Sequence, residues 1–317
     1  MKISIPKGLL YYKYFPMWKV FFEELGFDVM TSRDTSKKIM ESGLKIANDE
    51  LCLPVKIFHG HVADVKDKSN YIFIPRVINM RKGKNFFTCP KLMGLPDMIK
   101  GCFDDISHRL LEPDINLAKE PLEKTFIKLG KKLGEKEKAK KAIKRAMKAQ
   151  KDFEKLLEKG YMFEEALNIL FKGEKVKRRE RRFKKRVGII GHSYIVFDKF
   201  LNLNLFEKLE KLEVDYITMY NLPFSFLDFE DDYWNVAWVY EREIIGAVKY
   251  FIEKEKVDGI IYLLSFGCGT AIVVREIIMR DVIKGANIPF LPLILDEHTG
   301  EAGFMTRLES FCDILKK

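Results

Sequence analysis

Short apolar runs alternate with longer amphipathic segments at both ends of this 317-residue sequence. In the first part, strand-like runs cover residues 2–6, 27–32 and 71–77, and helix-like segments lie between them. Strands that alternate with helices predict a parallel sheet with helices on both faces. We therefore expect an α/β fold, with a doubly wound parallel sheet in this part of the chain.

The same alternation resumes after a long interruption. Strand-like runs then cover residues 187–191, 214–220, 259–266 and 289–297, and a helix closes the chain at 304–315. The pattern predicts three parts: a first α/β lobe at 1–116, a basic helical connector at 117–186, and a second α/β lobe at 187–317. The fold class is therefore two doubly wound lobes joined by a helical segment.

The connector holds most of the positive charge. It contains 25 Lys and Arg against 11 Asp and Glu, in a chain whose formal net charge is +10. Its apolar positions form a narrow helical stripe, interrupted by the polar Gln150: Ala139, Ile143, Ala146, Phe153 and Leu157. A solvated connector is the favoured interpretation, and a docking surface for an acidic protein is the alternative. We disfavour nucleic acid, because no aromatic residues interleave with the basic ones.

The sequence also indicates in which cellular compartment the protein is expected. No apolar run approaches the roughly 18 residues of a membrane span. The first residues lack the apolar core of a signal peptide, so we expect a cytoplasmic protein without a membrane partner. The five cysteines form no CxxC pair. Their odd number argues against a disulfide framework.

Three cysteines lie where a parallel sheet would bind ligands, at loops and helix starts. Cys89 follows the third predicted strand, Cys268 follows the apolar run 259–266, and Cys52 precedes a helix. Ligands of open parallel sheets bind at the carboxyl ends of the strands. A shared site is therefore possible, although simple burial is the alternative for each thiol. Cys312 lies among apolar residues of the closing helix and is expected to fill the core.

Five stretches carry a resemblance to a known family. They read NDELCLPVKIFHGHV, FIPR, CPKLMGLPDMIK, SFGCG and LDEHTGEAGFMTRLESF. Together they resemble the acyl-CoA dehydratase activase-related proteins, a family similar to the subunits of 2-hydroxyacyl-CoA dehydratases and to double-cubane cluster proteins. The resemblance spans both lobes but not the basic connector. It implies two flavodoxin-like lobes, with one 4Fe–4S cluster bound in the cleft between them by Cys52, Cys89 and Cys268.

This ligand set leaves the chemistry open. Three thiolates would leave one iron free for water or a substrate carbonyl, whereas Cys102 as a fourth ligand would close the site for electron transfer only. The implied activity is low-potential electron transfer in an anaerobe, or a dehydratase or reductase reaction on a small-molecule or acyl-CoA substrate. The sequence lacks a P-loop motif. The resemblance therefore implies a separate activator ATPase, or another redox protein, as partner.

Nearby polar residues could support such a site. His59 and His61 are two residues apart, so on a helix they point about 200° apart and cannot easily share one ion. We expect His59, together with Glu297 and His298 at the end of the last strand, to form hydrogen bonds around a cluster. A satisfied polar loop is the alternative for Glu297 and His298.

The leading functional hypothesis is therefore a protein that binds one 4Fe–4S cluster. The alternative is a non-catalytic accessory or scaffold module that binds an activator ATPase through the basic connector. A zinc hydrolase is disfavoured, because the sequence contains no compact set of His, Cys and acidic ligands.

Overall fold

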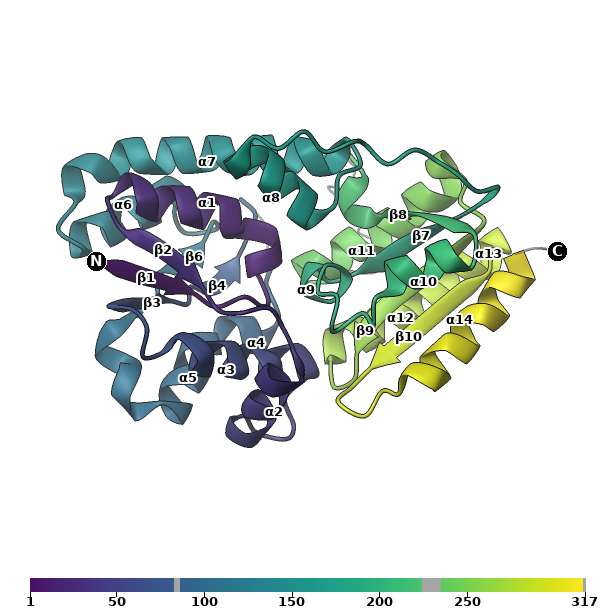
Figure 1. Cartoon of the computed structure of the whole chain (residues 1–317), viewed down its shortest axis with the longest axis horizontal. Helices are drawn as coiled ribbons and strands as arrows, with labels where there is room; N and C mark the ends of the chain where they lie inside the picture. Colours follow the sequence, from purple (N-terminus) through teal and green to yellow (C-terminus); the bar gives the residue numbers. More distant parts are fainter. Residues whose placement is uncertain (83–85, 224–234, 316–317) are drawn as a thin grey trace. The chain divides into compact units, whose positions relative to one another are not determined.

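The computed structural model describes residues 1–82, 86–223 and 235–315. The chain divides into two compact units, shown in Figure 1. Unit 1 comprises Met1–Phe153 with Ala237–Val239, and unit 2 comprises Glu154–Val236 with Tyr240–Lys317. Each unit contains a parallel sheet with helices on both faces, so the predicted class of two flavodoxin-like α/β lobes is confirmed. The boundaries at 117 and 187 stay a prediction from the sequence.

The sheet of unit 1 has its first strand in an inner position. Its order is β2 (Asp28–Thr31), β1 (Lys2–Ile5), β3 (Tyr71–Phe73) and β5 (Leu110–Leu111), all parallel. In Figure 1, α1 (Tyr11–Glu24) and α7 (Lys136–Glu158) lie on one side of this sheet, and α2 (Lys37–Ile46) and α3 (Leu53–Val65) on the other. The apolar strand residues are thereby covered on both faces.

The predicted strand at 71–77 is wrong as one element, because Pro75 divides it. Proline has no N–H to continue a ladder. The chain therefore leaves β3 and forms β4 (Arg76–Asn79), which pairs in parallel with β6 (Asp114–Asn116) in a separate two-stranded sheet. Three further α-helices lie in this region, α4 (Pro90–Met93), α5 (Leu95–Cys102) and α6 (Leu122–Lys132), together with the 3-10 helix η1 (Asp104–Arg109).

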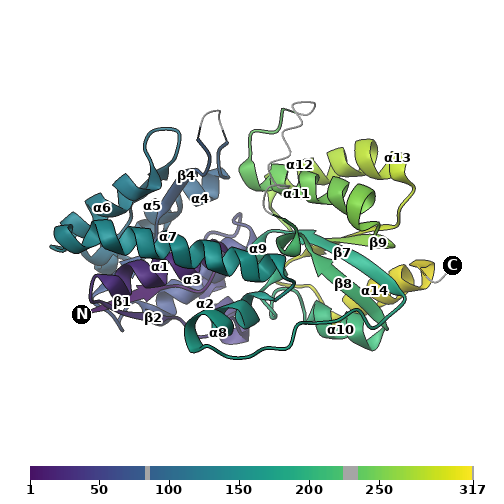
Figure 2. The same ribbon diagram turned by 90° about the horizontal axis from the view of Figure 1, so that it is seen from above.

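The basic helix α7 packs onto unit 1 through its predicted apolar stripe. Ala139, Ile143, Ala146 and Phe153 are buried, which confirms the helical spacing. The polar interruption has a partner, because the Gln150 amide nitrogen donates to the Lys13 carbonyl oxygen of α1 over 2.8 Å. Figure 2 shows α7 lying along α1.

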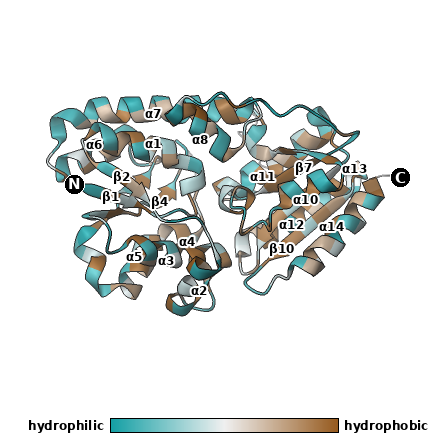
Figure 3. Cartoon of the chain, viewed as in Figure 1, coloured by the Kyte–Doolittle hydropathy of each residue, from teal (hydrophilic) through white to brown (hydrophobic). Residues whose placement is uncertain are grey.

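Unit 2 repeats the strand order of unit 1. Its parallel sheet runs β10 (Phe290–Leu295), β9 (Gly259–Ser265), β7 (Lys185–Gly191) and β8 (Val214–Thr218). All seven residues of β9 are buried, as expected for an inner parallel strand. The strands of this sheet are among the most hydrophobic elements in Figure 3.

Helices cover both faces of this second sheet. In Figure 2, α11 and α12 lie on one side and α10 and α14 on the other. The α-helices of this part of the chain are α8 (Phe163–Lys172), α9 (Ser193–Val196), α10 (Leu205–Lys211), α11 (Val239–Tyr250), α12 (Gly269–Ile277), α13 (Lys284–Ala286) and α14 (Glu301–Leu315). Cys312 of α14 is buried, as the sequence predicts. Within the described ranges, no helix is long and apolar enough to cross a membrane.

Two glycines bring α2 and α3 into backbone contact. A Cβ atom on Gly43 would lie 2.0 Å from the carbonyl oxygen of Lys56, and one on Gly60 would lie 2.0 Å from that of Ile39. The helix α2 itself begins after Ser36, whose hydroxyl accepts from the backbone N–H of Ile39. From the sequence, Ser32 or Asp34 would be expected to cap this helix; the cap is Ser36, so that expectation is wrong.

We expect Gly60→Ala to lower the free energy of unfolding by about 3 kcal/mol, because the added methyl group must separate two backbones. Chemical denaturation measures this change. Gly101→Ala on α5 is the control, since its Cβ would meet no atom within 4 Å; there we expect a change below about 1 kcal/mol. Equal losses in both variants would contradict the close approach.

Candidate functional site

Each of the three predicted cysteine ligands directly precedes a helix. Cys52 is the N-cap residue of α3, Cys89 that of α4, and Cys268 that of α12. A proline follows Cys52 and Cys89 in the first turn of their helices. Proline is favoured there because the first helical N–H groups have no helical partner. The Cys-Leu-Pro and Cys-Pro patterns are therefore also helix-start signals.

The thiols of unit 1 differ in exposure. Cys52 is 7% exposed, and burial raises the pKa of its thiol although Lys91 and Lys56 act against this shift. Cys102 is the exposed last residue of α5; its Sγ lies 3.7 Å from the Ile46 carbonyl oxygen, and burial raises its pKa as well. Burial thus favours the protonated form of both thiols.

A polar cluster occupies the carboxyl ends of β7 and β9 in unit 2. His192 follows β7, and its Nε2 lies 3.3 Å from the Glu241 carboxylate of α11. The Thr270 hydroxyl, after β9, donates to the same carboxylate oxygen. The Cys268 Sγ lies 3.6 Å from the Thr270 Oγ1. Thiol, hydroxyl, carboxylate and imidazole thus form one continuous chain of contacts.

The carboxylate at the centre of this cluster is only 2% exposed. Burial acts to raise the pKa of Glu241, but the hydrogen bonds from His192 and Thr270 outweigh it and lower the pKa. The His192 ring also stacks on Tyr194, with ring centroids 5.0 Å apart. The cluster therefore links the ends of two neighbouring strands through contacts to one buried carboxylate.

This cluster lies where doubly wound sheets usually bind ligands. The connections from β7 and β9 go to opposite faces, which makes this edge a topological switch point. Of these residues, the sequence singles out Cys268. It gives no signal for Glu241, because a glutamate within a charged helix normally faces solvent.

His59 and His61 of unit 1 have separate protein partners. The His61 ring contacts Ser32 through Nδ1 at 2.9 Å and Thr35 through Nε2 at 3.0 Å. The His59 Nδ1 donates to the Val55 carbonyl oxygen over 2.8 Å. Both rings are fully buried. His61 thus connects α3 to the loop that follows β2, and His59 bonds to its own helix.

The polar residues after β10 form a local turn. The Asp296 carboxylate accepts from the backbone N–H of His298 over 2.9 Å and from the Thr299 hydroxyl over 2.8 Å. The Glu301 carboxylate pairs with Lys208 at 2.7 Å. Asp296 therefore organises this loop. The predicted roles of Glu297, His298 and His59 around a cofactor stay predictions.

We expect acid to destabilise the protein through His61. Burial lowers the pKa of His61 from 6.5 to about 3. The unfolded chain therefore takes up a proton first, and stability is complete above pH 6.5 but falls as the pH drops toward 3. The slope is at most about 1.4 kcal/mol per pH unit for one proton.

Urea denaturation at several pH values from neutral to mildly acidic measures this slope. We expect His61→Gln to remove much of it, whereas His108→Gln, at an exposed position, should leave it unchanged. His59, whose pKa is also lowered by burial, supplies the remainder. An unchanged slope in His61→Gln would contradict this assignment.

The cysteines that the sequence predicts as cluster ligands belong to different units of the chain. No three His, Cys, Asp or Glu side chains among them are placed to hold a metal ion. Cys52 and Cys89 belong to unit 1, and Cys268 belongs to unit 2. The assignment of these cysteines as ligands, with Cys102 as a fourth, stays a prediction from the sequence.

A family model described as a CoA enzyme activase uncharacterised domain matches residues 2–222, more than half of the chain. No curated protein matches the sequence. The leading functional hypothesis, an iron–sulfur protein for electron transfer or dehydratase chemistry, is wrong: the matched family is an activase domain, and the described residues contain no cluster site. The resemblance to activase-related proteins is confirmed, whereas similarity to 2-hydroxyacyl-CoA dehydratase subunits is not. The chain belongs to the family of this CoA enzyme activase domain.

Proposed function

We propose that the chain is a non-catalytic accessory module of a CoA-enzyme activation system, and that it binds an activator ATPase through the basic outer face of α7. The observation that carries the proposal is a row of lysines on the exposed side of this helix. Successive members are three or four residues apart, so they share one face. They are Lys136, Lys140, Lys144, Lys148, Lys151 and Lys155, and all are exposed.

The opposite face of α7 cannot bind a partner, because it packs against unit 1. It is buried against unit 1, and the ion pair between Arg145 and Glu24, at 2.7 Å, fastens the helix to α1. The outer face therefore presents its charge from a fixed helix. Such a surface attracts an acidic partner and orients it, because complementary charge raises the rate and specificity of association.

The more basic stretch at 175–186 is a weaker candidate for this contact, because several of its side chains are bound within unit 2. The Arg179 guanidinium lies 3.4 Å from the centre of the Tyr216 ring and 3.2 Å from the Glu210 carboxylate. Arg182 also pairs with Glu210, at 3.2 Å. Arg186 pairs with Glu255 at 3.0 Å.

The backbone of this stretch is held as well. The N–H groups of Arg182 and Phe183 donate to one oxygen of Asp215, over 2.8 and 2.5 Å. We call residues 175–186 the strap. They have no regular secondary structure up to residue 184, and Lys185 and Arg186 are the first residues of β7. Much of the positive charge of the strap is therefore engaged in contacts within unit 2.

The family supports a partner of this kind. An activase acts on another protein, so a member of such a family needs a protein contact. A CoA enzyme is the second possible partner, and the experiment below separates the two.

We expect reversal of four α7 lysines to weaken binding of the activator ATPase by about a hundredfold, since each exposed charge contributes up to about 1 kcal/mol. The variant is Lys140, Lys144, Lys148 and Lys151 to Glu. Calorimetric titration with the purified ATPase, and separately with the CoA enzyme, measures the affinity at low and at high salt.

The control variant reverses four other exposed lysines: Lys45, Lys211, Lys254 and Lys284. It has the same net charge, so only a specific surface distinguishes the two. Equal losses in both variants, or no binding of the ATPase by the unmodified chain, would contradict the proposal. Binding of the CoA enzyme alone would replace the ATPase as the partner.

The strap should affect stability instead. We expect Arg179→Lys to lower the free energy of unfolding by about 1–2 kcal/mol, because an ammonium group stacks less well on Tyr216 and cannot span two carboxylates. The affinity for the ATPase should stay unchanged. A loss of affinity at unchanged stability would place the strap, and not α7, at the interface.

A further inference from the structure

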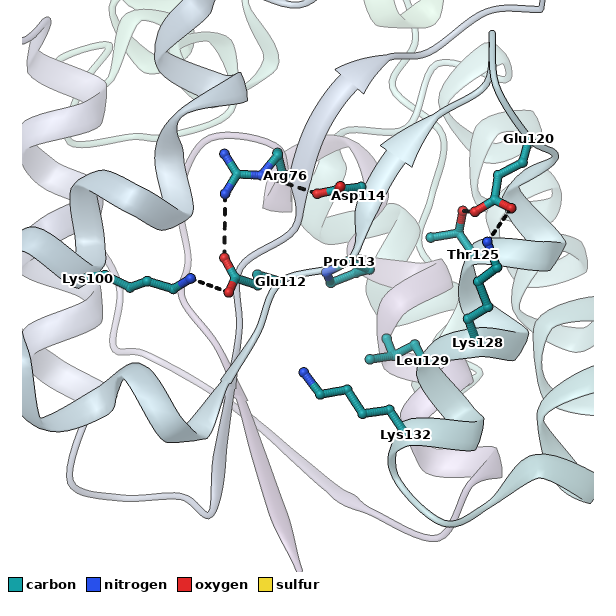
Figure 4. A pocket seen from close by; sticks show the side chains of 10 residues that line it. All are labelled: Arg76, Lys100, Glu112, Pro113, Asp114, Glu120, Thr125, Lys128, Leu129 and Lys132. Atoms are coloured by element: carbon teal, nitrogen blue, oxygen red, sulfur yellow. Dashed lines mark hydrogen bonds and ion pairs between the residues drawn. The ribbon is translucent and has the colours of Figure 1, made fainter.

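A cavity of about 550 Å³ opens in unit 1 beside the small β4–β6 sheet. Figure 4 shows its lining, which comes from four segments. Arg76 projects from β4, Lys100 from α5, and Glu112 from the chain just before β6, while α6 contributes Lys128 and Lys132. This volume lies within the roughly 300–1,000 Å³ of small-molecule sites.

The carboxylates that line the cavity form ion pairs with the lysine and arginine side chains that line it. Glu112 lies between Lys100 and Arg76, at 3.6 Å from the latter, and Asp114 pairs with Arg76 at 3.2 Å. Glu120 pairs with Lys128 at 2.6 Å. These internal pairs leave little negative charge to oppose an incoming anion.

Lys132 is the remaining cation. Its side chain extends from α6 into the cavity, and its ammonium group points toward the space beside Leu129 and Glu112 (Figure 4). None of the ion pairs formed within the described ranges includes it. A single ammonium that faces a cavity and retains all three donors is a compact binding group for a phosphate.

A second polar atom of the cavity lacks a partner. Glu112 Oε2 is buried, and no donor of the described residues forms a hydrogen bond with it. Its contact with Arg76, at 3.6 Å, is an ion pair without hydrogen-bond geometry. A buried acceptor without a donor costs stability. Because the Glu112 side chain lines the cavity, a ligand hydroxyl or amino group that displaces the cover of Oε2 would be favoured beside this carboxylate.

We propose that this cavity binds a small phosphomonoester that also carries hydroxyl or amino groups. The phosphate would lie at Lys132, next to Lys128 one turn earlier, and a donor group of the ligand would face Glu112. The side chains of Leu129 and Pro113 offer an apolar surface for a base or a sugar ring. The proposal is independent of α7 and goes beyond the proposed partner contact.

Calorimetric titration of the full chain with AMP, inorganic phosphate and adenosine tests the proposal. AMP should bind saturably and more tightly than either of the other two, because only AMP supplies both groups. We expect Lys132→Gln to weaken the binding of AMP by about tenfold, which is the effect of one charge-assisted hydrogen bond. Lys132→Arg should retain most of the affinity for AMP.

The matched control is Lys131→Gln. Lys131 is the exposed neighbour of Lys132 on α6 but does not line the cavity. The two variants have equal net charge, so an equal loss in both would mean diffuse attraction and would overturn the site. Absence of saturable binding by all three probes would overturn it too. If inorganic phosphate binds as tightly as AMP, the ligand of this cavity would be a simple anion and not a phosphomonoester.

Discussion

The parallel pairing of an inner first strand with the third strand determines the architecture of both units. In unit 2, β7 lies between β8 and β9, and in unit 1, β1 lies between β2 and β3. Each parallel connection must cross a face of the sheet, so helices cover both sides. The carboxyl ends of the inner strands then become the positions where polar side chains from distant segments can meet.

Much of this arrangement can be predicted from the sequence. Apolar runs such as 259–266 are long and uninterrupted, and they became strands close to their predicted limits. The helical stripe through Ala139 and Ile143 likewise predicted the buried face of α7. These signals are reliable because burial of an apolar face repeats at a fixed period. Shorter elements were missed: β5 has only two residues, too few for any period.

The sites were harder to predict for a physical reason. The sequence showed thiols and histidines as chemical types, but their roles depend on contacts made at a distance along the chain. Glu241 lies 49 residues after His192 and 29 before Thr270, yet the three form one buried cluster. The spacing of His59 and His61 spoke against a shared ion, but it could not show that the two ring nitrogens of His61 contact Ser32 and Thr35. Only the folded chain reveals such partners.

The strap has a further consequence for handling of the protein. Residues 175–186 contain nine Lys and Arg, a dense run of peptide bonds that trypsin can cleave. A protease needs an extended segment to lift away from its surroundings. Arg179 on Tyr216, and Asp215 beneath the backbone, oppose this lifting. The rate of tryptic cleavage within the strap therefore reports how often this edge of unit 2 opens.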